Sequence, residues 1–204
     1  SNVDSTSTAS LGVAFSNLGF LYLLDGKFEK LKSEKYILYV GDRSSYKNFD
    51  IAVEIANELS DYSFVIVGGG YLNNTEIKNI KTQYLHFQGI DTKELNILYN
   101  NAFCLVYPSS YEGFGIPLVE AMQAGCPVVS TNISSIPEVV GDAALLVDDI
   151  NYNCYLQEIK KLKNSDFRNI LITKGFQQAQ KFSWDKCAEE TYEFYKKALK
   201  KKFG

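Results

Sequence analysis

Two glutamates stand in the middle of the chain, on either side of a glycine-containing stretch, and could act on one ligand. Seven residues separate Glu112 from Glu120, and the segment between them includes Gly113, Gly115 and Pro117. Proline suits the first turn of a helix, and glycines just before it leave backbone N–H groups open at the positive helix end, where anions bind. Two carboxylates beside an anion site suit a ligand that also presents hydroxyl groups, as a nucleoside-diphosphate sugar does.

The alternative for these glutamates is that both are solvated surface charges. This is a poor explanation of Glu120, because its neighbours are Leu118, Val119, Ala121 and Met122, which predict a buried helix. A carboxylate in such a helix requires hydrogen-bond partners. We therefore expect Glu120 to face a polar ligand or a polar side chain.

A polar loop nearer the N-terminus carries Arg43 and Lys47. Arginine offers a planar fork of donors and lysine a mobile point charge, which together suit two phosphates. The chain has 21 lysine and arginine residues, and its only arginines are Arg43 and Arg168, so an arginine in a loop is notable. The loop lacks the Walker pattern. Two solvated surface cations explain the loop equally well when it is taken alone.

Two further loops contain glycines. Gly68, Gly69 and Gly70 follow an apolar run, but Asn73 stands where a dinucleotide-binding fingerprint requires glycine, so a tight turn is the better prediction. After the next apolar run, Ile90 could pack on a nucleotide base. By itself this last segment is better explained as a plain connection between a strand and a helix.

Composition excludes several classes of protein. The 204 residues are 46% apolar, which is enough for a hydrophobic core, and a net charge of −3 argues against sequence-independent nucleic-acid binding. One histidine, His86, and four cysteines without a CxxC pair leave almost no ligands for zinc or haem. In a chain of this size, reduced cytosolic thiols are the simpler expectation. No apolar run approaches the ~20 residues that a membrane span requires.

A parallel sheet is the scaffold that these loops require. Short apolar runs predict strands at 36–40, 64–67, 84–87, 103–107, 128–131 and 143–147. They do not alternate between polar and apolar residues, which is typical of parallel strands buried on both faces. Helical periodicity lies between them, for example from Phe49 to Leu59 and after a start signal at Asp91. We therefore expect an α/β fold with a doubly wound six-stranded parallel sheet, which binds ligands outside the carboxyl ends of its strands.

After the last predicted strand the pattern is helical only. The final helix should begin at Ser183, a good N-cap, with an apolar stripe from Trp184 to Leu199. Lysines gather at the end of this helix, where its dipole favours cations, and contact with an anionic membrane is the weaker explanation. We assign residues 1–35 to a linker and N-terminal segment and residues 36–204 to one domain.

The signature of a known enzyme family is similar to the segment YEGFGIPLVEAM, from Tyr111 to Met122. The segment resembles that of the retaining glycosyltransferases of family four, also called group one, which have the GT-B architecture. Further segments resemble family motifs in the same order: Gly125–Val129, Ser134–Ala144 and Phe182–Trp184. The similarity extends from about residue 37 to about residue 195, and several motifs in order are far more specific than any one of them.

This resemblance implies that the chain is the C-terminal, donor-binding half of an enzyme with two Rossmann-like halves. Such an enzyme transfers a hexose, with retention of configuration, from a UDP- or GDP-linked sugar to a glycan, lipid or other hydroxyl acceptor. An N-terminal half would hold the acceptor, so the chain alone is expected to be inactive. The final helix is similar to the one that crosses back to that half. We expect its stripe, and the apolar segment 15–24, to be exposed in the chain alone.

Site residues follow from the resemblance at matching positions. Arg43 and Lys47 would hold the diphosphate and stabilise its charge as the glycosidic bond breaks. Glu112 would contact hydroxyls of the donor sugar, and Glu120 those of the ribose. Ile90 would pack near the base, and the backbone of four residues would line the sugar and phosphate: Gly113, Phe114, Gly115 and Ile116. Many relatives have a longer gap between the arginine and the lysine, which leaves open whether Lys47 reaches the same phosphate oxygen.

The resemblance implies no metal cofactor, because Arg43, Lys47 and a helix end would do the work of a magnesium ion. These loops also lack the DxD-type carboxylate cluster that holds such an ion. We expect a cytoplasmic protein. The lysines at the end of the final helix leave open a peripheral contact with the inner face of the membrane. Two alternatives remain open: a nucleotide-sugar epimerase of the same architecture and a non-catalytic module that binds a nucleotide or a partner.

Overall fold

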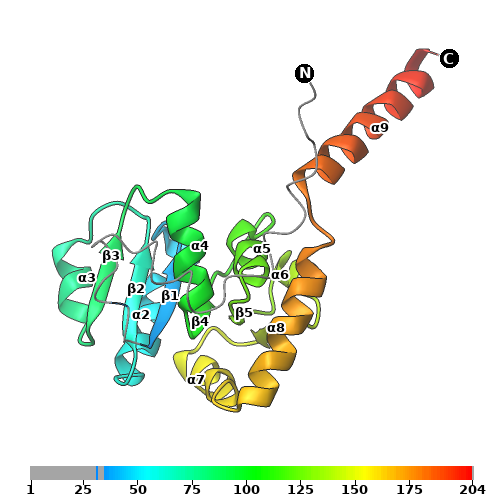
Figure 1. Cartoon of the computed structure of the whole chain (residues 1–204). Helices are drawn as coiled ribbons and strands as arrows, with labels where there is room; N and C mark the ends of the chain where they lie inside the picture. The colour runs from blue at the N-terminus through cyan, green and yellow to red at the C-terminus, as the bar shows by residue number, and fades with distance from the viewer. Residues whose placement is uncertain (1–30, 32–34, 204) are drawn as a thin grey trace, which may run out of the picture.

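A single parallel sheet organises the chain (Figure 1). The computed structural model describes residue 31 and residues 35–203. The six strands are β1 (Tyr36–Val40), β2 (Ser63–Val67), β3 (Tyr84–Phe87), β4 (Cys104–Tyr107), β5 (Val128–Thr131) and β6 (Leu145–Val147). Their order in the sheet is β3-β2-β1-β4-β5-β6, and every neighbouring pair is parallel. The predicted fold class is confirmed, and the strand bounds differ from the prediction by two residues at most.

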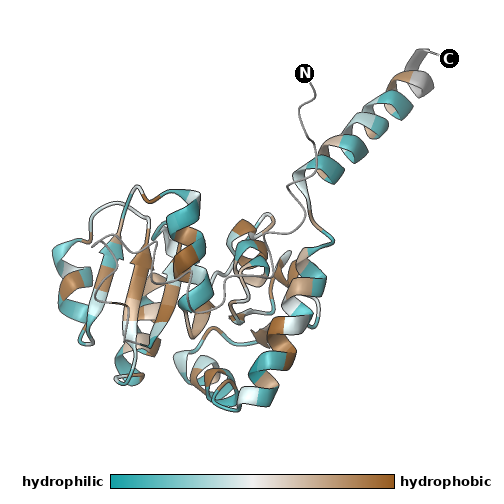
Figure 2. Ribbon diagram, in the orientation of Figure 1, coloured by the Kyte–Doolittle hydropathy of each residue, from teal (hydrophilic) through white to brown (hydrophobic). Residues whose placement is uncertain are grey.

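Burial explains why the strands read as uninterrupted apolar runs. Every residue of β1, β2, β4 and β5 is buried, whereas the edge strand β3 is half-buried throughout. The hydropathy colouring shows these central strands largely apolar (Figure 2). Strands covered on both faces have no polar side to alternate with.

Helices cover both faces of the sheet. Their bounds are α2 (Phe49–Glu58), α3 (Asn74–Asn79), α4 (Thr92–Asn101), α5 (Ile116–Gln123), α6 (Ile136–Val140), α7 (Tyr152–Lys161), α8 (Ser165–Ala179) and α9 (Trp184–Phe203), with a 3-10 turn, η2 (Ser45–Lys47). Leu38 faces one core, which it shares with residues of α4, α5 and α6. Its neighbour Ile37 faces the other core, which it shares with residues of α2 and α7.

The direction of the chain through the sheet reverses between β1 and β4. From β1 the chain moves outward to β2 and β3, and α4 then returns it to the other side of β1. β1 and β4 lie side by side, with Ile37 opposite Cys104. The loops after these two strands therefore diverge at the carboxyl edge of the sheet, which is the switch point where open α/β sheets hold ligands.

The last helix, α9, extends away from the body of the domain (Figure 1). Its side chains are exposed from residue 184 to residue 199, including Trp184 at 77% and Tyr192 at 62%. The predicted start is confirmed, because the Ser183 hydroxyl accepts a hydrogen bond from the N–H of Lys186. The predicted exposure of the apolar stripe is confirmed as well.

Some predictions fall outside the described part of the chain. The apolar segment 15–24 and most of the predicted linker 1–35 lie there, so both stay predictions. Among the helices that the structure describes, none is long and apolar enough to span a membrane. The four cysteines are free thiols: Cys104, Cys126, Cys154 and Cys187.

Candidate functional site

Two loops meet at the switch point and carry the predicted site. Lys47 ends the turn η2, and Asn48 then adopts a left-handed conformation (φ 46°) that leads the chain into α2. The Asn48 side chain donates to the carbonyl of Pro108 over 2.8 Å, and the N–H of Ser110 donates to the carbonyl of Tyr46 over 2.7 Å. These bonds fasten the loop after β1 to the loop after β4.

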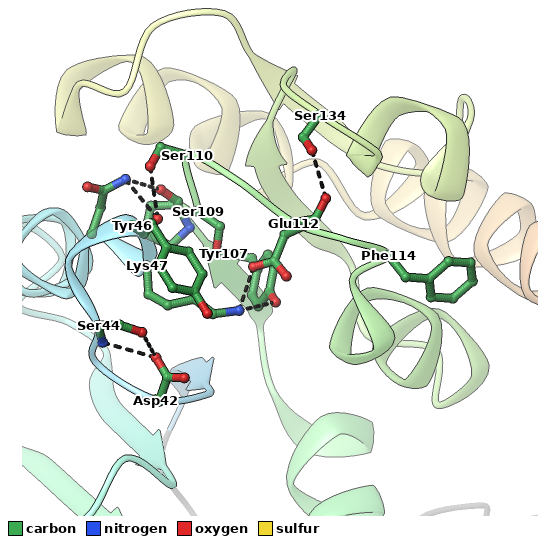
Figure 3. A network of polar contacts seen from close by, with 12 residues as sticks. Asp42, Ser44, Tyr46, Lys47, Tyr107, Ser109, Ser110, Glu112, Phe114 and Ser134 are labelled. Atoms are coloured by element: carbon green, nitrogen blue, oxygen red, sulfur yellow. Dashed lines mark hydrogen bonds and ion pairs between the residues drawn. The ribbon is translucent and has the colours of Figure 1, made fainter.

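The ammonium group of Lys47 lies against the carboxylate of Glu112 (Figure 3). Lys47 Nζ donates to Glu112 Oε1 over 2.5 Å and to the Tyr107 hydroxyl over 2.9 Å. It also lies 5.0 Å from the centre of the Tyr107 ring and 5.3 Å from that of Tyr46, within range of a cation–π contact. Only 11% of the Lys47 side chain and 9% of the Glu112 side chain are exposed. A nearly dry ion pair therefore occupies the switch point.

The loop after β5 holds the backbone of Glu112. The hydroxyls of Ser134 and Ser135 both donate to the backbone carbonyl of Glu112, over 2.7 and 2.9 Å. Ser134 holds a left-handed conformation (φ 59°), which is uncommon outside glycine, asparagine and aspartate. The Thr131 hydroxyl donates to the carbonyl of Ser109 over 2.6 Å. Residues after β5 thus fix the backbone of Glu112, and Lys47 from the loop after β1 holds its carboxylate.

Open backbone N–H groups follow Glu112 directly. None of the N–H groups of residues 113–116 has a hydrogen-bond partner within the described part of the chain, whereas the N–H of Leu118 donates to the carbonyl of Gly115. Gly115 is the N-cap of α5 at φ 94°, and Pro117 occupies the first turn as predicted. Two features favour glycine at position 115: its φ is left-handed, and a Cβ there would lie 2.8 Å from Cδ1 of Leu118. The start of α5 is therefore an open, positive helix end.

Glu120 lies in α5, farther from this open end than Glu112. It is half-buried, and its Oε2 accepts a hydrogen bond from the Tyr99 hydroxyl over 3.2 Å. Burial raises the pKa of Glu120, and the Tyr99 hydrogen bond offsets part of that rise. The polar side chain predicted to partner this carboxylate is thus a tyrosine of α4.

Arg43 occupies the predicted loop, but its guanidinium is directed at other parts of the protein. Nε donates to Glu76 over 2.8 Å, and the two terminal nitrogens donate to the carbonyls of Gly68, Gly70 and Tyr71. Only 7% of the Arg43 side chain is exposed. The structure therefore brings Lys47 to Glu112, whereas all the hydrogen bonds that it describes for Arg43 lead to the loop after β2 and to α3.

The remaining predicted residues line the same edge. Phe114 is 43% exposed and packs edge-on against Phe182, with ring centres 5.4 Å apart. Ile116 is 46% exposed, and Ile90 is half-buried against the core. Gly113 has open space where a Cβ would project. Their contacts with a ligand stay predictions.

Sequence reasoning missed Tyr107, Tyr99 and Glu76 as partners of site residues. Tyr107 and Tyr99 read as parts of an apolar strand and an apolar helix stripe, because tyrosine buries its ring as readily as phenylalanine. Only the position of Tyr107 could have indicated its role, because it is the last residue of β4, directly before the loop that carries Glu112. Within residues 31 and 35–203, no group of three or more histidine, cysteine or acidic side chains could hold a metal ion.

Fold and site together define a Rossmann-like domain with an ion pair and a positive helix end at its switch point. The chain belongs to the family described as glycosyl transferases group 1, whose model matches residues 24–178.

Two curated relatives are named as O-antigen chain mannosyltransferases. The chain is 43% identical over 108 residues to O-antigen chain mannosyltransferase B of Escherichia coli, which covers 52% of this chain and 28% of that protein. It is 32% identical over 176 residues to O-antigen chain mannosyltransferase RfbU of Salmonella typhimurium, covering 79% of this chain and 49% of the relative. The chain therefore spans about half of these relatives or less.

Solved structures share the fold. Sucrose-phosphate synthase of Thermosynechococcus elongatus superposes with a TM-score of 0.72 at 23% identity, over 82% of this chain and 46% of the enzyme. HepE of Anabaena, in complex with UDP-glucose, gives a TM-score of 0.73 at 15% identity, over 82% of this chain and 50% of HepE. WaaG, a glycosyltransferase of lipopolysaccharide biosynthesis, gives 0.65 at 21% identity, over 76% of this chain and 45% of WaaG. The sheet matches the C-terminal domain of the GT-B fold.

Proposed function

We propose that this chain is the donor-binding half of a retaining glycosyltransferase, which transfers a hexose from a nucleoside-diphosphate sugar to a hydroxyl acceptor. The observation that carries the proposal is the Lys47–Glu112 pair beside the open N–H groups of residues 113–116. A cation, a carboxylate and a helix end at the switch point match a ligand with both phosphates and sugar hydroxyls.

Lys47 and the start of α5 receive the diphosphate. The ammonium supplies a mobile positive charge, and the N–H groups supply fixed partial charges at the positive helix end. When the bond between sugar and phosphate breaks, negative charge grows on the diphosphate. Donors that are already oriented stabilise this charge without reorganising, and each is worth roughly 3 kcal/mol in the transition state.

The two carboxylates hold the hydroxyls on either side of the diphosphate. Glu112 is fixed by Ser134 and Ser135 and accepts hydrogen bonds from the donor sugar. Glu120 accepts hydrogen bonds from the ribose, with Tyr99 keeping its side chain oriented. Ile90 packs near the base, and Phe114 and Ile116 line the sugar with the glycines beside them. We do not assign Arg43 to the diphosphate, because the hydrogen bonds described for its guanidinium all stay inside the protein.

Retention of configuration follows if the acceptor attacks from the face that the diphosphate leaves. In this route the leaving phosphate takes the proton of the acceptor hydroxyl as the new bond forms. The site then needs to stabilise the leaving group above all, which is the role of Lys47 and the helix end. No metal ion is needed for this charge balance.

The sugar we propose is mannose, carried by GDP or UDP. Two relatives at 43% and 32% identity are named as mannosyltransferases, and a solved structure of the same fold contains UDP-glucose. An acceptor-binding half completes the enzyme, because the chain spans about half of its relatives or less. The exposed stripe of α9 is where that half packs, and the chain without it binds donor but does not transfer sugar.

A thermal-shift panel of UDP, GDP, ADP and NAD on this chain tests the proposal. A ligand at 100 times its dissociation constant adds about 2.7 kcal/mol, which raises the unfolding midpoint by roughly 5–10 °C in a domain of this size. We expect that rise with UDP or GDP. A rise with NAD alone, or with none of the four, would contradict the proposal.

Activity requires the complete protein. With the acceptor-binding half present, GDP-mannose or UDP-mannose should be consumed only when a hydroxyl acceptor is present. Turnover of the nucleotide sugar into an isomer without acceptor, seen by NMR, would instead identify an epimerase.

A further inference from the structure

The guanidinium of Arg43 is the most fully engaged cation among the described residues. Four of its hydrogen bonds stay inside the protein: one to Glu76 (2.8 Å), one to the carbonyl of Gly68 (3.1 Å), and two to the carbonyls of Gly70 (3.1 Å) and Tyr71 (2.8 Å). A guanidinium has five N–H donors in all. Four of these five donors are used within the protein, which leaves one N–H of the guanidinium for any other acceptor.

The loop after β2 is built around this guanidinium. Gly68, Gly69 and Gly70 all have positive φ, at 89°, 76° and 72°, which confirms the predicted tight turn. A Cβ on Gly69 would lie 2.4 Å from a terminal nitrogen of Arg43, so this glycine makes room for the arginine. The carbonyl oxygens of Gly68, Gly70 and Tyr71 all accept from this one guanidinium, so Arg43 satisfies three acceptors of the loop.

Glu76 fixes the other side of the guanidinium. Its Oε1 accepts from Arg43, and its Oε2 accepts from the backbone N–H of Asn73 over 2.7 Å. The Asn73 side chain in turn accepts from the N–H of Glu76, which makes a capping box at the start of α3. One carboxylate therefore ties Arg43 to a helix terminus.

The same loop contacts the neighbouring strand. The N–H of Gly68 donates to the carbonyl of Phe87 over 2.9 Å, and its carbonyl lies 3.0 Å from Nε2 of His86. A carbonyl oxygen only accepts, so Nε2 carries the proton. In the strand order, β2 lies between β3, which leads to Ile90, and β1, which leads to Lys47. The glycine loop thus separates the proposed base position from the proposed diphosphate position.

We infer that Arg43 is a positioning residue: with Glu76 it holds the Gly68–Tyr71 loop in the shape that receives the nucleoside of the donor, and it does not contact the diphosphate. The inference rests on the proposed function. The two cations of the loop after β1 then have different roles: Lys47 binds the phosphates, and Arg43 holds the Gly68–Tyr71 loop in place.

Comparing the affinity for a nucleoside with the affinity for its diphosphate distinguishes these two roles. The dissociation constants of this chain for UDP and uridine, or GDP and guanosine if GDP is the ligand, are measured for wild type, Arg43→Ala, Glu76→Gln, the double variant and Lys47→Ala. Arg168→Ala is the matched control, because this arginine also donates to backbone carbonyls, those of Ala102 and Phe103, at the opposite edge of the sheet.

Arg43→Ala and Glu76→Gln should each weaken nucleoside and diphosphate by the same factor, roughly tenfold, and the double variant should be no weaker than either. Lys47→Ala should weaken only the diphosphate, and the control neither. Hydrogen exchange without any nucleotide should be faster at Gly68, whose N–H donates to Phe87, in both Arg43→Ala and Glu76→Gln.

Loss of diphosphate binding alone in Arg43→Ala would overturn the inference. So would tighter diphosphate binding in Glu76→Gln, which is expected if the variant frees an arginine that binds phosphate, or unchanged exchange at Gly68. A wild-type chain that binds neither UDP nor GDP would instead overturn the proposed function, and the nucleoside part of this inference with it. The exchange result reports on the arginine in either case.

Discussion

Replacing Lys47 by alanine should cost the protein both stability and function. The substitution leaves the Glu112 carboxylate buried without its cation, and breaking a buried ion pair from one side costs about 3–5 kcal/mol. It also removes a positive charge from the proposed diphosphate position, which should lower kcat/KM of the complete enzyme about 100-fold. Urea unfolding of the chain measures the first effect, and steady-state transfer by the complete enzyme measures the second.

A double variant separates these two effects. Lys47→Met with Glu112→Gln removes both charges, so no unpaired ion stays buried and most of the lost stability should return. Diphosphate binding should not return, because the cation is still missing. If the double variant bound UDP or GDP as wild type does, Lys47 would be a structural residue and the site assignment would be wrong.

Replacing Glu120 by glutamine should move stability and function in opposite directions. Burial raises the pKa of Glu120, so the folded chain holds the proton more tightly than the unfolded chain does. Ionisation of this group therefore favours unfolding, and its contribution to stability falls as the pH rises from the ordinary pKa of a glutamate through the raised one. Glutamine keeps an acceptor for the Tyr99 hydroxyl and carries no charge. The variant should thus be more stable than wild type at pH 7.

Donor binding should weaken in the same variant. A carboxylate can accept from two ribose hydroxyls with a full charge, whereas glutamine offers one neutral acceptor, so affinity for the nucleoside diphosphate should fall roughly tenfold. Thermal unfolding at pH 4 and pH 7 and titration with UDP or GDP measure both effects. The stability gain should shrink at the acid end. A variant less stable than wild type at pH 7, or one that binds equally well, would contradict this role for Glu120.

The strands and the site loops were predictable because buried strands are runs of apolar residues and because site loops follow directly after them. A run such as Tyr36–Val40 is apolar on both faces because helices cover both faces. Gly115 and Pro117 were predictable because a helix start favours particular residues. Glu112 was predictable as a carboxylate just before that start. The direction of a side chain leaves no such pattern in the sequence. Arg43 has the right type in the right loop, yet its guanidinium is directed by Glu76, which lies 33 positions away.

Partnerships across the sheet were equally hidden. Tyr107 belongs to the core by its ring and to the site by its hydroxyl, and only the packed structure shows that Lys47 Nζ meets it. The same holds for Tyr99 and Glu120, which come from adjacent helices. Sequence reasoning therefore found which residues carry chemistry more readily than which residues hold them in place.

Hydrogen exchange of this chain, with and without UDP or GDP, tests most directly whether the ligand lies at the switch point. The nucleotide should slow exchange in residues 44–48 and 110–118, which form the two loops after β1 and β4. It should leave residues 59–63 and 163–168, at the opposite edge of the sheet, unchanged. Protection at that opposite edge, or no protection in residues 110–118, would show that the pair of Lys47 and Glu112 is not where the donor binds.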